Sequence, residues 1–195
     1  MAVNPMFQRL ALLTGPAVIE ALSAVRIIVF GLGGVGSWCA EALVRSGAGR
    51  IVLVDSDTVC VTNINRQIQA GPATVGRYKT EALRERLLGI NPRCEAAAFG
   101  GVFSGETADS FGIAGADYCI DAIDSLTHKL DLIEYAAAAG MILASLVIRD
   151  LYARYAGGAE AGTGAGYGAG YGAKGGAKGG ASCGGGAAEG EAAYG

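Results

Sequence analysis

The sequence has little of what nucleic-acid binders, zinc proteins and membrane proteins usually show. Its 15 lysines and arginines are outnumbered by 18 acidic residues and are scattered, so no basic stripe indicates a nucleic-acid surface. The five cysteines form no C-x-x-C pair, which argues against structural zinc and favours a reducing cytoplasm. The longest uncharged apolar run, 135–148, is shorter than the roughly 20 residues that span a bilayer. We therefore expect a cytoplasmic protein without a stable membrane segment, and composition leaves peripheral membrane association open.

Composition divides the chain into two parts. Over residues 1–156, short β-branched runs alternate with helical patterns, which is typical of βαβ units. Strands are expected at 25–30, 51–54, 94–99, 118–120 and 141–146, and helices at 37–46, 78–88 and 125–139. We predict one α/β domain over residues 1–156, with a Rossmann-like, mainly parallel sheet and helices on both faces.

Residues 157–195 consist largely of glycine and alanine and contain almost no larger aliphatic side chains. Such a segment cannot bury enough apolar surface to offset the entropy of ordering glycine, so one interpretation is a linker. The other is that glycine and alanine stand there for side chains that were not identified. The sequence leaves both interpretations open.

Apolar residues at helical spacing predict which side of each helix faces the core. The expected core residues are Ala40, Leu43 and Val44 in the first helix, Leu83, Leu87 and Leu88 in the second, and Leu126, Leu130 and Ile133 in the third. Trp38 and Cys39 are also expected to pack. The only histidine, His128, is assigned no catalytic role, since a lone histidine on a helix more often packs or meets solvent.

A glycine-rich run follows the first expected strand and precedes a helix, which is the context that makes a G-x-G-x-x-G motif meaningful. In GLGGVG, Gly31 permits a tight turn, Gly33 and Gly34 let the backbone approach a phosphate, and Gly36 allows close packing of helix on strand. Helix N-terminal amides then face the anion. The run predicts a nucleotide site.

Polar residues after the second strand favour a triphosphate over a dinucleotide. Asp55 stands where a carboxylate accepts hydrogen bonds from a ribose, and Asp57 follows it closely. Asn63 and Arg66 lie in TNINRQ, and Lys79 opens the next helix. Arginine and lysine are the usual phosphate ligands, so we predict that both act in catalysis as exposed residues of a cleft.

Two carboxylates come at the end of the fourth strand, in DAIDS. Asp124 is expected at the carboxyl edge of the sheet, where ligands of open α/β folds bind, and it can hold Mg²⁺ or orient reacting groups. Asp121 is interpreted as structural.

Four segments together resemble the ubiquitin-activating-type, or ThiF-type, adenylyltransferase superfamily: GLGGVGSW, VLVDSDTVCVTNINRQ, TVGRYKTEALRERLLGINP and DAIDSLTHK. The resemblance covers residues 7 to about 140. It implies that residues 1–156 form an ATP-binding domain that activates a carboxylate as its AMP ester, with ATP and Mg²⁺ as cofactors.

Within this superfamily, TNINRQIQ, GRYKTEALRERL and AIDSLTHKLDLIE are most similar to the dehydratases of threonylcarbamoyladenosine in tRNA. The likeness implies adenylation of that carboxylate and ring closure, with release of AMP and pyrophosphate. It assigns the ribose to Asp55, the phosphates to Arg66 and Lys79, and the metal and reacting phosphate to Asp124. Arg9 matches the superfamily arginine that reaches the partner's ATP in a homodimer.

Three other functions stay open at this point. An adenylyltransferase that activates a ubiquitin-like sulfur-carrier protein shares the same motifs, and it would make such a carrier a partner. Many of those enzymes carry two C-x-x-C zinc pairs, which this sequence lacks. An NAD-dependent oxidoreductase shares the glycine loop and Asp55 but has no use for Arg66 and Lys79. A catalytically idle binding module would normally have lost Arg66, Lys79 or Asp124.

Overall fold

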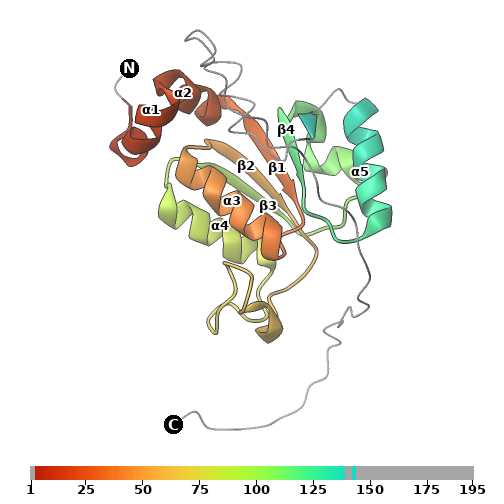
Figure 1. Cartoon of the computed structure of the whole chain (residues 1–195). Coiled ribbons are helices and arrows are strands. Elements are labelled where there is room, and N and C mark those ends of the chain that lie inside the picture. The colour runs from red at the N-terminus through yellow and green to blue at the C-terminus, as the bar shows by residue number, and fades with distance from the viewer. Residues whose placement is uncertain (1–2, 139–141, 144–195) are drawn as a thin grey trace, which may run out of the picture. The chain divides into compact units, whose positions relative to one another are not determined.

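Short apolar runs form the centre of the fold, a parallel sheet of five strands in the order β3-β2-β1-β4-β5. The computed structural model describes residues 3–138 and 142–143 (Figure 1). The strands are β1 (Arg26–Phe30), β2 (Arg50–Val54), β3 (Glu95–Phe99), β4 (Tyr118–Asp121) and β5 (Ile142–Leu143). Every pairing between neighbours is parallel, and helices cover both faces, so the predicted Rossmann-like α/β fold is confirmed.

The helices connect these strands or precede them. They are α1 (Gln8–Thr14), α2 (Pro16–Ala24), α3 (Gly34–Ser46), α4 (Lys79–Ile90) and α5 (Leu126–Ala138). Short 3₁₀ turns η1–η4 span Pro5–Phe7, Val61–Asn63, Ala108–Phe111 and Ile113–Gly115. Helix α3 begins before the predicted residue 37 because the glycine loop itself forms its first turn. It ends at Gly47, whose φ of 110° is the left-handed conformation that glycine accommodates.

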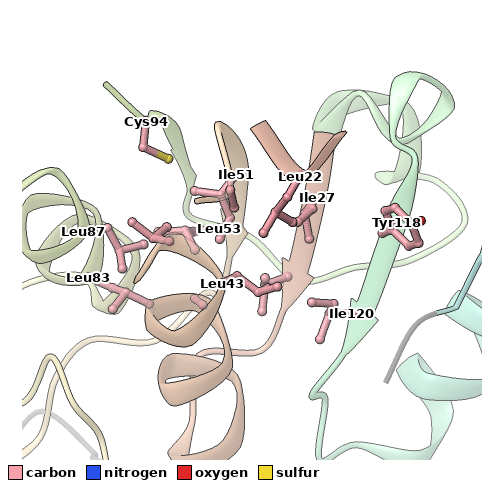
Figure 2. Packing of buried hydrophobic residues seen from close by; sticks show 14 of the residues in the cluster. Leu22, Ile27, Leu43, Ile51, Leu53, Leu83, Leu87, Cys94, Tyr118 and Ile120 are labelled. Carbon is pink, nitrogen blue, oxygen red and sulfur yellow. The ribbon is translucent and has the colours of Figure 1, made fainter. Parts of the chain in front are cut away.

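Alternating residues of the strands build two cores, one on each face of the sheet. Ile27 and Ile51 face α3 and α4 and pack with Leu43, Leu83 and Leu87 (Figure 2). On the other face, the cluster consists of Ile28, Phe30, Val52, Val54, Phe103, Ala108, Phe111, Ile113, Cys119 and Leu132. The predicted inward faces of the two helices on the first side are confirmed, except that Leu88 is only half-buried.

The predicted inward face of α5 is wrong. Leu126, Leu130 and Ile133 are 70%, 54% and 42% exposed, whereas Leu132 and Ala136 are buried. Leu132 and Ala136 also have helical spacing, so α5 carries two apolar stripes and periodicity alone cannot choose between them. The sheet packs against the stripe that contains Leu132.

Several expectations fall partly or wholly outside the described residues. The last strand was expected at 141–146, and the described part of it is β5. Met141 and residues 157–195 are not described, and the domain boundary at 156 stays a prediction. Within the described part of the chain, no helix is both long and apolar enough to cross a membrane.

A buried carboxylate joins α3 to α4. Glu41 accepts hydrogen bonds from Arg45 Nε at 2.7 Å and from Arg86 Nε at 2.6 Å, and its side chain is only 6% exposed. Burial alone would raise the pKa of Glu41, but the hydrogen bonds and charges of Arg86 and Arg45 outweigh it and lower the pKa. The folded state therefore favours the ionised form.

We predict that Glu41→Gln lowers the free energy of unfolding by about 1–2 kcal/mol at neutral pH, since one ionic acceptor is lost. A lowered folded-state pKa contributes stability above the usual value of 4.5, and this is lost as the pH falls through the folded-state pKa. The difference from wild type should therefore shrink in acid. Urea unfolding at several pH values measures it.

Glu85→Gln is the matched control, because Glu85 pairs with Arg77 on the exposed surface of α4. It should change stability by less than about 0.5 kcal/mol. Equal effects of the two substitutions would contradict the role given to Glu41.

Candidate nucleotide site

The glycine loop places the start of α3 directly on the end of β1. Gly31 has φ of 83°, and a Cβ there would lie 2.5 Å from the carbonyl oxygen of Ala122, beyond the end of β4. A Cβ on Gly36 would lie 1.8 Å from the carbonyl oxygen of Gly31. These two glycines are therefore required by packing within the chain.

Gly33 and Gly34, in the middle of the loop, are less crowded than Gly31 and Gly36. A Cβ on Gly33 would meet no atom within 4 Å, and one on Gly34 would be in ordinary contact with the aliphatic part of Arg66, 3.5 Å from its Cγ. Packing therefore does not demand glycine at Gly33, which leaves room for a ligand to approach the backbone. The amides of the first turn of α3, a helix of 13 residues, provide the partial positive charge that binds anions.

Asp55 follows β2 and is attached to the glycine loop. Its Oδ2 accepts a hydrogen bond from Leu32 N at 2.6 Å, and its Oδ1 accepts one from Asp57 N at 2.8 Å. Burial raises the pKa of Asp55, although these two N–H groups and the charge of Lys79 oppose the rise. The carboxylate therefore lies at the sheet edge where a ribose was predicted.

Lys79 is buried, and the prediction that it is an exposed cleft residue is wrong. Only 8% of its side chain is exposed. Its Nζ lies 2.7 Å from Asp57 Oδ2 and 3.9 Å from Asp55 Oδ1. Desolvating an ammonium group is costly unless carboxylates surround it, and two do so here. The first residue of α4 thereby links the helix to the two acidic residues after β2.

Arg66 is exposed, as predicted, and its guanidinium is held locally. Nη1 donates to the carbonyl oxygen of Thr62 at 2.8 Å and to Asn65 Oδ1 at 3.0 Å. Trp38 donates from Nε1 to the backbone oxygen of Arg66 at 3.0 Å. Trp38 was expected to pack, but 57% of it is exposed, and it instead connects α3 to the segment that carries Arg66.

Asn63 is buried and shapes the turn before Arg66. Its Oδ1 accepts from Cys60 N at 2.9 Å, and its backbone oxygen accepts from the N–H groups of Arg66 and Gln67. In this arrangement Asn63 acts on Arg66 through the backbone.

Two carboxylates after β4 have separate environments. Asp121 accepts a hydrogen bond from Ile123 N and pairs with Lys129 Nζ at 2.5 Å, which agrees with the structural role predicted for it. Asp124 is exposed. Because Ile123 N would be 3.1 Å from a Cβ on Gly31, this segment borders the glycine loop.

The described residues contain no group of three or more side chains arranged to hold a metal. One carboxylate suffices for Mg²⁺ where phosphates and water complete the shell, and Asp124 fits that role.

Two polar residues that sequence reasoning missed also contact the loop. Ser37 donates from Oγ to the Gly33 carbonyl at 2.7 Å and accepts from Ile68 N at 3.4 Å. Gln69 donates from Nε2 to the Leu32 carbonyl at 2.9 Å. Ser37 lies in GLGGVGSW and Gln69 in TNINRQIQ, but no known sequence spacing marks either residue as part of the site.

Arg9 is the one site candidate that lies elsewhere. It is exposed on α1, next to η1, whose Phe7 packs at Gly47 where α3 ends. The glycine loop is at the opposite end of α3, and α1 lies far from the segment before α4 (Figure 1). Arg9 therefore does not contribute to the site of its own chain in this structure.

We predict that Lys79→Met lowers the free energy of unfolding by about 1–3 kcal/mol, since it leaves Asp55 buried without its cation. Asp57 is 65% exposed and should contribute little to the loss. Without Lys79 the pKa of Asp55 rises further, so an ionised Asp55 destabilises the fold above that pKa. The difference from wild type should shrink as acid protonates Asp55. Thermal unfolding at several pH values checks this.

Arg66→Ala is the matched control, because an exposed arginine with local partners should change stability by less than about 0.5 kcal/mol. A Tm of Lys79→Met equal to that of wild type would contradict the role of Lys79 in the acidic pair.

Three relatives have similar sequences or structures. The tRNA threonylcarbamoyladenosine dehydratase of Bacillus subtilis is 44% identical over 128 residues, which is 66% of this chain and 50% of the relative. The molybdopterin-synthase adenylyltransferase of Salmonella typhimurium is 35% identical over 113 residues, 58% of this chain and 45% of the relative. The crystal structure of the Escherichia coli tRNA N6-threonylcarbamoyladenosine dehydratase in complex with ATP superposes with a TM-score of 0.70. It is 39% identical, and the match covers 73% of this chain and 60% of that one.

The chain spans about half the length of the curated relatives it matches. The model of the ThiF family matches residues 7–151, which include the sheet, the glycine loop and every site candidate. The chain belongs to the ThiF family.

Proposed function

We propose that the chain carries the nucleotide-binding part of a cytoplasmic, ATP-dependent dehydratase that acts on threonylcarbamoyladenosine in tRNA. The observation that carries this proposal is the convergence of the glycine loop, Asp55, Lys79 and Arg66 at one edge of the sheet. A relative with this named activity is 44% identical, and a similar structure is a complex with ATP. The relative supports the proposed activity, and the similar structure supports ATP as the nucleotide.

Each group has a role that follows from its surroundings. Asp55, fixed by two N–H groups, keeps lone pairs available for the ribose hydroxyls. The amides at the start of α3 bind the phosphates, and Lys79 adds positive charge beside them. Mg²⁺ held by Asp124 would neutralise the pyrophosphate.

The guanidinium of Arg66 is exposed and donates to Thr62 and Asn65, so it can exchange these acceptors for the phosphate oxygens of ATP.

The reaction needs positioning and charge neutralisation more than an acid or a base. An oxygen of the substrate carboxylate attacks the α-phosphorus of ATP, and the bond to pyrophosphate breaks. The acyl adenylate is then attacked at its carbonyl carbon by a nitrogen or oxygen of the same nucleoside, and AMP leaves with the carboxylate oxygen. The nucleoside loses one water overall. Arg66→Ala and Lys79→Ala should each lower the rate on the order of 10²-fold or more.

The proposed enzyme is a homodimer in which Arg9 acts on the site of the other copy. Arg9 lies on α1, away from the glycine loop of its own chain, so any action of Arg9 on ATP would be at the site of another copy. Leu12 and Leu13 on the same helix are 82% and 79% exposed, and an interface would cover them.

One second function has specific support. The molybdopterin-synthase adenylyltransferase is 35% identical over 113 residues, so this chain also resembles an enzyme of a different name. Activation of the C-terminal glycine of a sulfur-carrier protein is therefore the competing proposal. A nicotinamide enzyme is disfavoured because the exposed Arg66 would have no role in it. An idle module is disfavoured because Arg66, Lys79 and Asp124 are all present.

We predict that AMP release from ATP is stimulated by tRNA that carries threonylcarbamoyladenosine. Unmodified tRNA and a ubiquitin-like protein ending in Gly-Gly should not stimulate it. The assay supplies the three in parallel and follows AMP together with loss of one water mass from the nucleoside. Stimulation should fall steeply with salt, because phosphate contacts release counterions. AMP release with the carrier protein alone would move the chain to the sulfur-transfer function.

A second prediction tests Arg9 across the dimer. Mixing Arg9→Ala chains with Asp124→Ala chains should restore part of the activity, because one of the two sites in a mixed dimer regains both groups. Each variant alone should be inactive, and mass spectrometry should verify that mixed dimers form. Verified mixed dimers without recovered activity would exclude action in trans.

A further inference from the structure

The peptide groups on both sides of Leu32 are held by buried side chains from two other segments. Leu32 N donates to Asp55 Oδ2 at 2.6 Å, and the Leu32 carbonyl accepts from Gln69 Nε2 at 2.9 Å. Leu32 itself is fully buried. Its neighbours Gly31 and Gly33 have no side chains to resist rotation of these peptides, so the two hydrogen bonds supply the restraint.

Gln69 holds the carbonyl in a way that does not favour stability. It is only 4% exposed, and Nε2 also donates to Gln67 Oε1 at 3.3 Å. Its own Oε1 has no hydrogen-bond partner among the described residues. A buried acceptor without a partner destabilises a fold, and such groups in native proteins often mark functional constraints. Gln69 therefore contributes to the loop through its Nε2–H donor, which binds the Leu32 carbonyl.

The same segment is attached to α3 at two further points. Trp38 Nε1 donates to the backbone oxygen of Arg66, and Ile68 N donates to Ser37 Oγ at 3.4 Å. Residues 66–69 therefore contact both the glycine loop and the start of α3, and Gln69 is the buried residue at the end of this segment. Movement of the Leu32 carbonyl would alter both the loop amides and the position of Arg66.

We propose that Gln69 is a positioning residue for the nucleotide, which fixes the Leu32 carbonyl so that the loop amides and Arg66 meet the phosphates together. This inference rests on the proposed function, because it takes ATP as the ligand of the loop. Gln69 acts through Leu32 and needs no contact with ATP.

Gln69→Leu removes the donor and keeps an apolar side chain of similar size. We expect the Kd for ATP, measured by calorimetry, to rise about tenfold, which corresponds to the loss of one hydrogen bond. Gln69→His keeps an N–H at a similar reach and should restore the affinity to within about threefold of wild type. Hydrogen exchange without ATP gives an independent readout, since the Leu32 amide should exchange faster in Gln69→Leu and at the wild-type rate in Gln69→His.

Asn91→Leu is the matched control, because it also replaces a buried amide. Asn91 directly follows α4, at the end of the helix away from the glycine loop, and its Oδ1 accepts a hydrogen bond from Arg93 N. Its Tm should fall while the Kd for ATP and the exchange of the Leu32 amide stay at wild-type values. In Gln69→Leu the orphan Oε1 is removed, but the Leu32 carbonyl and Gln67 Oε1 lose their donor. The Tm should therefore fall no more than in Asn91→Leu, whereas the Kd for ATP should change in Gln69→Leu alone.

The outcomes separate the two proposals. If wild type binds ATP and Gln69→Leu binds it equally well, Gln69 does not position the loop and the inference is wrong. Loss of Tm and of ATP binding in proportion, with no recovery in Gln69→His, would also overturn it in favour of a purely structural role. No ATP binding by wild type would overturn the proposed function, and the inference with it.

Discussion

The site depends on the close approach of α3 to the end of β1. A Cβ at Gly36 would overlap the Gly31 carbonyl, so only glycine lets the helix begin there. With that contact made, the first amides of α3 point beyond the sheet edge, where Asp55 and the segment after β4 also end. Any side chain at Gly36 would push the helix away and separate these groups.

The two positively charged side chains of the site, Lys79 and Arg66, have different surroundings. Lys79 is buried between Asp57 and Asp55, and its charge is part of the folded structure. Arg66 is exposed, and its guanidinium donates to Thr62 and Asn65, which are nearby in the sequence, so it can reorient at small cost. Lys79 therefore contributes to stability and to the field of the site together, whereas Arg66 is free to follow a ligand.

The two ends of α3 have different roles, since one contributes to stability and the other lies where the ligand would bind. Glu41 with its two arginines joins α3 to α4 along their lengths, and Phe7 packs at the far end of α3. At the loop end of α3, Ser37 and Trp38 form hydrogen bonds, and Gln69 binds the Leu32 carbonyl of the loop. Hydrogen bonds are directional, so they define the loop geometry that a phosphate would require.

The sequence by itself determined the parallel α/β fold, the glycine loop and most of the residues that converge on it. Local patterns suffice there, because strand and helix periodicity and the close approach of Gly36 to Gly31 act between residues near one another in the chain. Only the tertiary structure decided that Lys79 is buried, that Leu126, Leu130 and Ile133 face outward, and that Gln69 holds Leu32. Each of these depends on which segments, distant in sequence, pack together, since burial and hydrogen-bond partners are properties of the assembled sheet edge.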